Sequence, residues 1–292
     1  MCNINMLFNL KGGYFMLKKF FVFSLIALFV FGMAACGKTG AEGKYEDGLY
    51  YAENEAYSKD WKYFVKIEVK DGKIASVDWN GVNLNGGKDK DTLSAEGGYP
   101  MVEKGDAQAP WHEQAELVEE YLIETQDPEK VAFTDEDGHT DDIAGVTIKV
   151  KDFFDLAKKA LENGPVAKGD YKDGIYYAQE KEFTKGFKNF AHIAVVNGTI
   201  VAVDFNAIVE EGDVLDKDNL SRSGAYGLVE KGGAQAEWHE QVAKAEAHLI
   251  KTQDPEKISY IDDEGHTDDI AGVSIHVKEF FDLAKQALAE AK

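Results

Sequence analysis

The chain has 292 residues, and its 53 acidic and 32 basic side chains give a formal charge of −21 at pH 7. A chain this acidic is poorly suited to bind nucleic acid, because it repels the phosphate backbone. Its two cysteines are Cys2 and Cys36, and the first precedes the processing site expected below. We therefore expect the mature chain to have no intrachain disulfide, no cysteine-ligated iron–sulfur cluster and no CxxCH haem site.

Residues 1–35 have the features of an export signal. They contain no acidic residue, and Lys18-Lys19 is followed by an apolar run over residues 20–31 that is too short for a membrane span. The small residues before Cys36 resemble a bacterial lipobox, which implies that a lipid-modified Cys36 is the mature N-terminus. The alternative is an ordinary signal peptide with an incidental cysteine. We expect translation to begin at Met16, after an upstream leader, because a ribosome-binding sequence can encode the Lys-Gly-Gly that precedes it.

The remainder of the chain is a tandem duplication. Trp111-His112-Glu113-Gln114 recurs 127 residues later as Trp238-His239-Glu240-Gln241, whereas landmarks near the start of each copy recur after 126 residues. The second copy therefore gains one residue in the part that corresponds to Asn80–Tyr99, which predicts a variable loop there. Each copy has the size of an ordinary domain. The expected organisation is a tether over 36–43, a first domain over 44–163, a linker over 164–170 and a second domain over 171–292.

Each copy has the pattern of an α+β domain, in which helices pack on an antiparallel sheet. Apolar and polar residues alternate on both sides of Asp71-Gly72, and Asn197-Gly198 takes the same place in the second copy; both dipeptides suit a two-residue hairpin turn. Helical spacing follows, with stops at Asp127-Pro128 and Gly164. The first copy is expected to contain a hairpin over 63–79, a Gly-rich loop over 82–98, a helix over 111–125, a short strand over 131–134 and a helix from Val150.

A turn of small residues ends in a hydroxyl in both copies. Residues 138–147 read Gly-His-Thr-Asp-Asp-Ile-Ala-Gly-Val-Thr, and residues 265–274 repeat them with Ser274 in place of Thr147. Each hydroxyl comes just before a helix-patterned run, and the N–H groups and dipole of a helix N-terminus favour a phosphate. Gly145 and Gly272 would allow close backbone approach. The alternative is that the hydroxyl is only a helix N-cap.

Trp-His-Glu-Gln contains the His-Glu pair of a zinc motif but lacks its second histidine. Glu116 and Ala243 stand at the required position, so we expect no metal site there. His112 and His239 then either orient a loop or a phosphate, or cap a helix.

The remaining candidates each have a structural and a functional interpretation. His139 and His266 are either general bases or members of hydrogen-bonded loops, and a hydrolase is disfavoured because no GxSxG elbow is present. Aromatic residues at matching positions either pack in the core or contact an aromatic ligand. They are Trp111 and Trp238, and Tyr99 and Tyr226.

The segment Asp142–Thr147, the Asp-Gly-x-Tyr near the start of each copy and the hairpin resemble the FMN-binding domain family. Tandem copies behind a lipobox are similar to the surface flavin lipoproteins of Gram-positive bacteria that serve extracellular electron transfer. The resemblance implies FMN joined by a phosphoester to Thr147 and Ser274, attached by a separate transferase that uses FAD and a divalent cation. The sequence departs from the family motif at Ala144, Val146 and their counterparts in the second copy. The cofactor-binding residues implied are Thr147, Ser274, Gly145, Gly272, Val146, Val273, Asp142, Asp269, His112 and His239.

The expected protein is therefore a lipid-anchored, extracytoplasmic flavoprotein. It would carry electrons from a membrane reductase or quinol to an extracellular acceptor such as ferric iron or free flavin, and the flavin would supply the redox chemistry. Two alternatives stay open: a solute-binding or adhesion lipoprotein without flavin, and a flavin-dependent reductase with its own substrate.

Overall fold

The computed structural model describes residues 43–105 and 107–292. The expected signal peptide, the lipidated Cys36 and all but the last residue of the tether lie outside this part of the chain. Within the described residues, no helix is long and apolar enough to cross a membrane.

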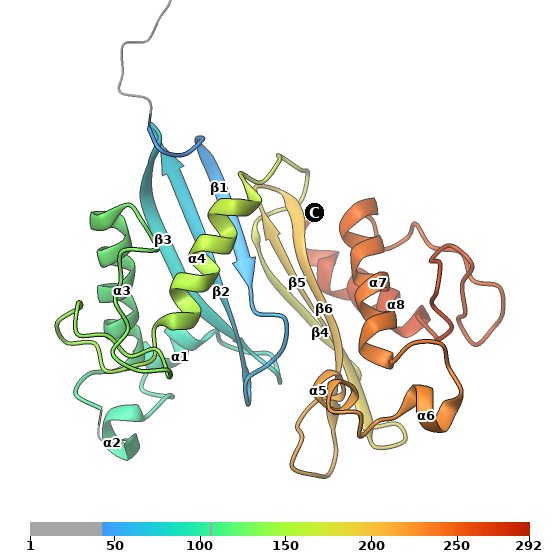
Figure 1. Ribbon diagram of the computed structural model, residues 1–292. Helices are drawn as coiled ribbons and strands as arrows, with labels where there is room; N and C mark the ends of the chain where they lie inside the picture. The colour runs from blue at the N-terminus through green and yellow to red at the C-terminus, as the bar shows by residue number, and fades with distance from the viewer. Residues whose placement is uncertain (1–42, 106) are drawn as a thin grey trace, which may run out of the picture. The chain divides into compact units, whose positions relative to one another are not determined.

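The first repeat is a three-stranded antiparallel sheet in the order β1-β2-β3, with its two longest helices packed on it (Figure 1). Helix α3 packs on β3, and α4 packs on β1 and β2. The α+β class expected from the sequence is confirmed. The elements are β1 (Gly48–Glu53), β2 (Trp61–Lys70), β3 (Lys73–Asn83), α1 (Lys90–Ala95), α2 (Met101–Gly105), α3 (Trp111–Thr125) and α4 (Lys151–Asn163).

The second repeat has the same architecture, with sheet order β4-β5-β6. Helix α7 packs on β6, and α8 packs on β4 and β5. The extra residue of this copy falls between β6 and α5, in the variable loop expected from the sequence. The elements are β4 (Gly174–Gln179), β5 (Phe187–Val196), β6 (Thr199–Val209), α5 (Lys217–Arg222), α6 (Leu228–Gly232), α7 (Trp238–Thr252), α8 (Lys278–Ala287) and the 3₁₀ helix η1 (Leu288–Glu290).

The hairpin turn between β2 and β3 has the expected geometry. Asp71 has φ 51° and Gly72 has φ 72°, and Asn197 and Gly198 repeat these values at 52° and 75°. Two successive positive φ angles match the twist of an antiparallel hairpin, which fixes the strand register. Strand β3 is longer than expected and continues to Asn83, and the polar loop that follows contains the short helix α1.

The short strand expected over residues 131–134 is wrong. This segment has no strand partner, because its backbone groups bond within the following loop. The N–H of Ala132 donates to the Asp142 carboxylate at 2.7 Å, and the N–H of Thr134 donates to the His139 carbonyl at 2.8 Å. The β-branched and aromatic residues that suggested a strand therefore line a loop that closes on itself.

Each repeat has a core of its own, and both repeats belong to one compact unit over Gly43–Lys292. A further apolar cluster brings together Tyr51 and Phe64 of the first sheet with Ala194 and Ala202 of the second. Buried Lys62 forms ion pairs with Glu53 of its own repeat at 2.7 Å and with Asp204 of the other at 3.5 Å. These contacts were not predicted from the sequence.

The linker over residues 164–170 is hydrogen-bonded to both repeats. The N–H of Val166 donates to the Leu49 carbonyl at 2.7 Å, and the N–H of Gly169 donates to the Asn197 carbonyl at 2.8 Å. Helix α4 ends where the linker begins, at Gly164 with φ 81°. The connection is therefore held along both sheets.

Candidate functional site

The two hydroxyls singled out by the sequence lie in the same environment in both repeats. Thr147 and Ser274 are exposed. The side-chain carbonyl of Gln114, on α3, accepts from the Thr147 N–H at 2.7 Å and from its hydroxyl at 3.2 Å. Gln241, on α7, binds Ser274 at the same two distances. Each hydroxyl is thus presented to solvent on a turn fixed to a long helix.

The glutamine that holds this turn is fully buried, with 0 % of its surface exposed in either repeat. Its amide nitrogen is satisfied as well: Gln114 Nε2 donates to the Ala109 carbonyl at 2.8 Å, and Gln241 Nε2 donates to that of Ala236 at 2.9 Å. A buried amide with both ends bonded has one defined orientation. The turn is therefore anchored by a side chain that cannot swing away without losing its own bonds.

The N-cap interpretation of the hydroxyls is wrong. Helix α4 is capped by Val150 and α8 by Val277, and neither cap makes a side-chain hydrogen bond. Thr147 lies three residues before its cap, and its hydroxyl turns to Gln114 instead. The hydroxyl therefore does not have the capping role that most often explains a Ser or Thr ahead of a helix.

The two repeats also share the geometry of the aspartates that the sequence places beside the hydroxyls. Asp142 accepts from the Ala132 N–H at 2.7 Å, and Asp269 accepts from the Ser259 N–H at the same distance. Both carboxylates are exposed. They fix the loop, and no hydrogen bond joins either of them to the hydroxyl among the described residues.

The residues between aspartate and hydroxyl have backbone and packing roles. Gly145 and Gly272 have φ 88° and 76°, a region that favours glycine. Val146 is buried and packs in the core, while Val273 is half-buried against its own core. A difference between the repeats lies here, because Lys244 Nζ donates to the Gly272 carbonyl at 3.1 Å. The second hydroxyl therefore has a lysine close to its turn.

His112 and His239 are not brought to the hydroxyls. His112 Nδ1 pairs with Ser94 Oγ at 2.9 Å, and His239 Nδ1 pairs with Ser221 Oγ at the same distance. Residues two apart on a helix point in different directions, so His112 and Gln114 serve different neighbours. The histidine fixes the start of α3 to the short helix α1.

His139 and His266 are members of hydrogen-bonded loops. His139 Nδ1 lies 2.6 Å from an Asp135 carboxylate oxygen, and His266 Nδ1 lies 2.6 Å from that of Asp262. The same aspartates accept from the backbone N–H of the histidines at 3.1 Å. The structural interpretation of these histidines therefore holds for Nδ1, while Nε2 is left to other partners.

A buried lysine surrounded by aromatic rings lies at the start of α1, and the sequence analysis missed it. Lys90 is only 2 % exposed. Its ammonium nitrogen is 4.4–5.2 Å from the ring centroids of Trp61, Tyr63, Tyr99 and Trp111, and it donates to the Tyr63 hydroxyl. Cation–π attraction stabilises an ammonium in such a cage.

The second repeat has the same arrangement with fewer polar groups. Lys217 Nζ lies 4.6–4.8 Å from the centroids of Phe187, Tyr226 and Trp238. Tyr226 corresponds to Tyr99, so the matching tyrosines noticed in the sequence surround a lysine in both copies. We call these two sets of residues the lysine cages.

Burial lowers the pKa of both caged lysines. Burial and then repulsion from Lys59 lower the pKa of Lys90 to about 7. Burial lowers the pKa of Lys217 to about 8, and the attraction of Glu180 and Glu279 opposes the shift. Both amines therefore titrate near neutral pH, where an ordinary lysine is fully charged.

The caged lysine is positioned by a polar link between α1 and β3, which is half-buried in the first repeat and buried in the second. Asp89, the N-cap of α1, accepts from the Thr92 N–H at 2.9 Å and from Asn80 Nδ2 on β3 at 2.9 Å. Asp216 and Asn206 repeat the link in the second copy. The recurrence of Asp-Lys-Asp-x-Leu-Ser at residues 89–94 and 216–221 was the signal that could have found this feature.

The hydroxyl turn and the lysine cage meet on the first turn of α3. Trp111 belongs to the cage and Gln114 holds Thr147, and residues three apart on a helix are neighbours. Trp79 packs against Trp111 with ring centroids 5.3 Å apart, and its indole N–H is buried without a partner among the described residues. The first turn of α3 therefore connects an exposed hydroxyl on its turn to a buried group of aromatic rings, an amine and an indole donor.

The same combination recurs at the start of α7, except that no group corresponds to the indole N–H of Trp79. Phe205 stands where Trp79 lies in the first repeat, and it packs against Trp238 with centroids 6.3 Å apart. The two sites therefore share their hydroxyl turn and caged lysine and differ in the polar groups around them.

No protein-family model matches the chain, and no curated protein matches it. Two solved structures do. A solution NMR structure of a protein from Clostridium thermocellum is 63% identical and covers 40% of this chain and 91% of its own, with a TM-score of 0.34. A crystal structure of a protein from Clostridium perfringens is 26% identical and covers 41% of this chain and 88% of its own, with a TM-score of 0.33. Both are structural-genomics proteins of unnamed function, and each match has about the length of one repeat. The part of the chain that the structure describes consists of two tandem small α+β domains.

Proposed function

We propose that this protein is an extracytoplasmic electron carrier with FMN joined by phosphoester bonds to Thr147 and Ser274. A lipid on Cys36 would hold it at the membrane. Electrons would pass from a membrane reductase or quinol to an extracellular acceptor such as ferric iron or free flavin. A separate transferase would attach the flavin.

The observation that carries the proposal is the matched geometry of the two hydroxyls. Each is exposed and lies on a turn fixed by a buried glutamine 33 residues earlier. Neither caps the helix that follows. An exposed hydroxyl on a rigid turn, preserved in both repeats without a packing role, suits a point of covalent attachment.

The surroundings of each hydroxyl fit a flavin in their chemistry. The phosphate end would lie on the turn of Gly145 or Gly272, where positive φ angles keep the backbone open. Trp111 and Trp238 of the lysine cages lie one helical turn from the glutamines but are buried, so contact with a flat aromatic group would fall to the half-buried Tyr99 and Tyr226. Lys90 and Lys217 would supply amines that titrate near neutral pH, and bound flavin would supply one- and two-electron transfer.

A covalent bond also fits an exported carrier. A flavin held only by weak contacts would be lost to the surroundings whenever it dissociated. Of the departures from the family motif, Ala144 and Ala271 lie on exposed positions of the turn, whereas Val146 is buried and Val273 is half-buried. They leave the hydroxyls and their glutamines in place.

The test is the intact mass and visible spectrum of the full chain produced with a flavin-attaching transferase, followed by peptide mapping. We expect yellow protein with two FMN-sized additions, on the peptides that contain Thr147 and Ser274. Thr147→Ala and Ser274→Ala should each remove one addition. The conservative changes Thr147→Ser and Ser274→Thr should keep both. Thr134→Ala, which removes another exposed hydroxyl of the same loop, is the matched control and should also keep both.

Colourless protein of unmodified mass that also fails to bind added FMN would overturn the proposal. That result would favour a solute-binding or adhesion lipoprotein. Saturable turnover of a specific substrate by the yellow protein would instead favour a flavin-dependent reductase.

A further inference from the structure

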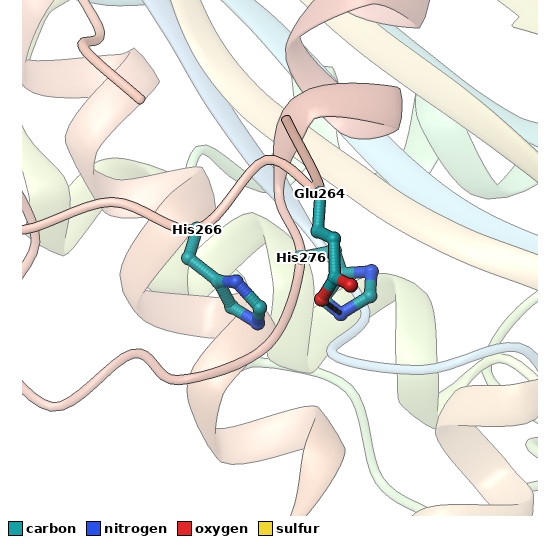
Figure 2. Close-up of side chains that lie close together, drawn as sticks. All are labelled: Glu264, His266 and His276. Carbon is teal, nitrogen blue, oxygen red and sulfur yellow. Dashed lines mark ion pairs between the residues drawn. The ribbon is translucent and has the colours of Figure 1, made fainter. Parts of the chain in front are cut away.

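Two histidines and a glutamate lie close together in the loop before α8. Glu264, His266 and His276 each offer a ligand atom, and these atoms all lie within 4.8 Å of one another. The rings of His266 and His276 are 4.4 Å apart and nearly perpendicular, and His276 Nε2 is 3.8 Å from a Glu264 carboxylate oxygen. Figure 2 shows the three side chains side by side, with the glutamate against the His276 ring.

One histidine of this cluster is already oriented as metal-ligating histidines usually are. Asp262 accepts from His266 Nδ1 at 2.6 Å and from the His266 backbone N–H at 3.1 Å. With Nδ1 as the donor, Nε2 keeps its lone pair. A carboxylate behind a ligating histidine fixes the ring and raises its basicity.

The loop that carries the cluster is rigid in its backbone. The Ile261 N–H donates to the His266 carbonyl at 2.9 Å, and the Val277 N–H donates to the Gly265 carbonyl at 3.0 Å. Gly265 has φ 88°, and a Cβ there would lie 2.4 Å from the Lys278 Cβ. The loop thus holds both histidines near one another, while the exposed Glu264 side chain is free to adjust.

The first repeat has the same loop with one decisive difference. Asp135 and His139 pair at 2.6 Å, as Asp262 and His266 do. Lys149 replaces His276, and its ammonium forms an ion pair with Asp137 at 2.8 Å. A fixed ammonium and a metal ion would compete for the same carboxylate. The first repeat therefore serves as a built-in control.

We propose that the second repeat binds one borderline divalent transition-metal ion, of the Zn²⁺, Ni²⁺ or Cu²⁺ class, through Glu264, His266 and His276. Imidazole and carboxylate are the ligands that these ions prefer, and they bind such sites more tightly than Mg²⁺ or Ca²⁺. Zinc bonds of about 2.0–2.2 Å place ligand atoms roughly 3.3 Å apart, so small side-chain rotations would close the cluster around the ion. A fourth position would remain open to water.

The site is independent of the flavin proposal, although His276 comes two residues after Ser274. An ion here would place positive charge on the loop next to the second hydroxyl only. The two proposals are separated by the Ser274→Ala variant, which should still bind the metal ion but should lack the flavin of the second repeat.

The experiment is isothermal titration of Zn²⁺ into the full chain without a histidine tag, at a salt concentration that screens the acidic surface. We expect one ion per chain. His276→Lys, which copies the first repeat, should abolish this binding, and His266→Ala should do the same. Asp262→Asn, which keeps all three ligands, should weaken it about 10- to 100-fold. Circular dichroism of each variant establishes that it is folded.

The converse variant tests the same idea by gain of function. Asp137→Glu combined with Lys149→His copies the second repeat into the first, and it should raise the stoichiometry to two ions per chain. The proposal is overturned if His276→Lys binds Zn²⁺ as the unaltered chain does. It is overturned equally if Mg²⁺ or Ca²⁺ competes at the same concentration, since that would indicate attraction to the acidic surface alone.

Discussion

Glu119 offers a test of the electrostatics behind the candidate site. It lies on α3, and its carboxylate accepts from the backbone N–H of Trp79 on β3 at 2.7 Å. Burial, together with Asp78 and other acidic neighbours, raises the pKa of Glu119 to about 8, although the hydrogen bond from Trp79 opposes the shift. In the unfolded chain the carboxyl would titrate near its ordinary value of about 4.3.

The direction of the pH effect follows from this difference. Between about pH 4.5 and pH 8 the folded state holds a proton that the unfolded state has released, so stability falls as pH rises. Below this range both states are protonated, and the penalty vanishes. The difference between a pKa of about 8 in the folded state and about 4.3 in the unfolded state is equivalent to about 5 kcal/mol, an upper limit because the side chain is half-buried and its surroundings relax.

Glu119→Gln should remove this penalty and keep an oxygen for the Trp79 N–H. We expect the variant to match the unaltered chain near pH 4 and to be more stable by about 2–5 kcal/mol at pH 9. Urea unfolding followed by tryptophan fluorescence gives this difference, and three of the four tryptophans, including Trp79, lie in the first repeat. Glu120→Gln, at the next and exposed position of the helix, should change stability by less than about 0.5 kcal/mol. A gap that stays constant with pH, or narrows as pH rises, would refute the reasoning.

Three further predictions concern the hydroxyl turn, the loop and the lysine cage. Gln114→Leu should destabilise the first repeat by about 1–3 kcal/mol in urea unfolding, because the backbone donors of the turn lose their buried acceptor; an unchanged midpoint would mean that water replaces it without cost. Gly265→Ala should lower the melting temperature more than Gly87→Ala. Both glycines have φ near 88°, but only at Gly265 would a Cβ lie 2.4 Å from a neighbouring side chain. Equal effects on the melting temperature would show that backbone strain alone decides the cost. Lys90→Met should be more stable than the unaltered chain near pH 7, because burial lowers the pKa of the Lys90 amine to about 7 in the folded state. The difference in stability should shrink as pH rises toward 10.5, where the unfolded chain also loses this proton. A difference that widens with pH would contradict the buried-amine interpretation.

The two repeats differ in ways that give each experiment an internal comparison. Lys149 in the first loop and His276 in the second decide which copy offers a metal ligand. The Tyr63 hydroxyl accepts a hydrogen bond from Lys90, the caged lysine of the first repeat. Asn189 stands at the position of Tyr63 in the second repeat. Duplication followed by divergence of a few side chains would therefore give two sites of the same plan with different electrostatics.

The sequence alone determined the features that depend on local spacing. The repeat, the hairpin turn at Asp71-Gly72, the helix from Trp111 to Thr125 and the stop at Gly164 follow from turn chemistry and periodicity, which act within a few residues. The recurrence of the hydroxyl turn also singled out Thr147 and its counterpart, although their exposure was known only from the structure. The expected strand over residues 131–134 failed because a loop satisfied its backbone.

Only the tertiary structure decided which side chains meet. Gln114 reaches Thr147 across 33 residues because α3 lies beside the loop before α4, and no local pattern states that distance. Lys90 is exposed or caged according to where α1 packs on β3, since a lysine is buried only when its surroundings compensate its charge. His266 and His276 likewise become neighbours through the closing of one loop. Local chemistry thus fixed the elements, whereas packing between distant elements created the sites.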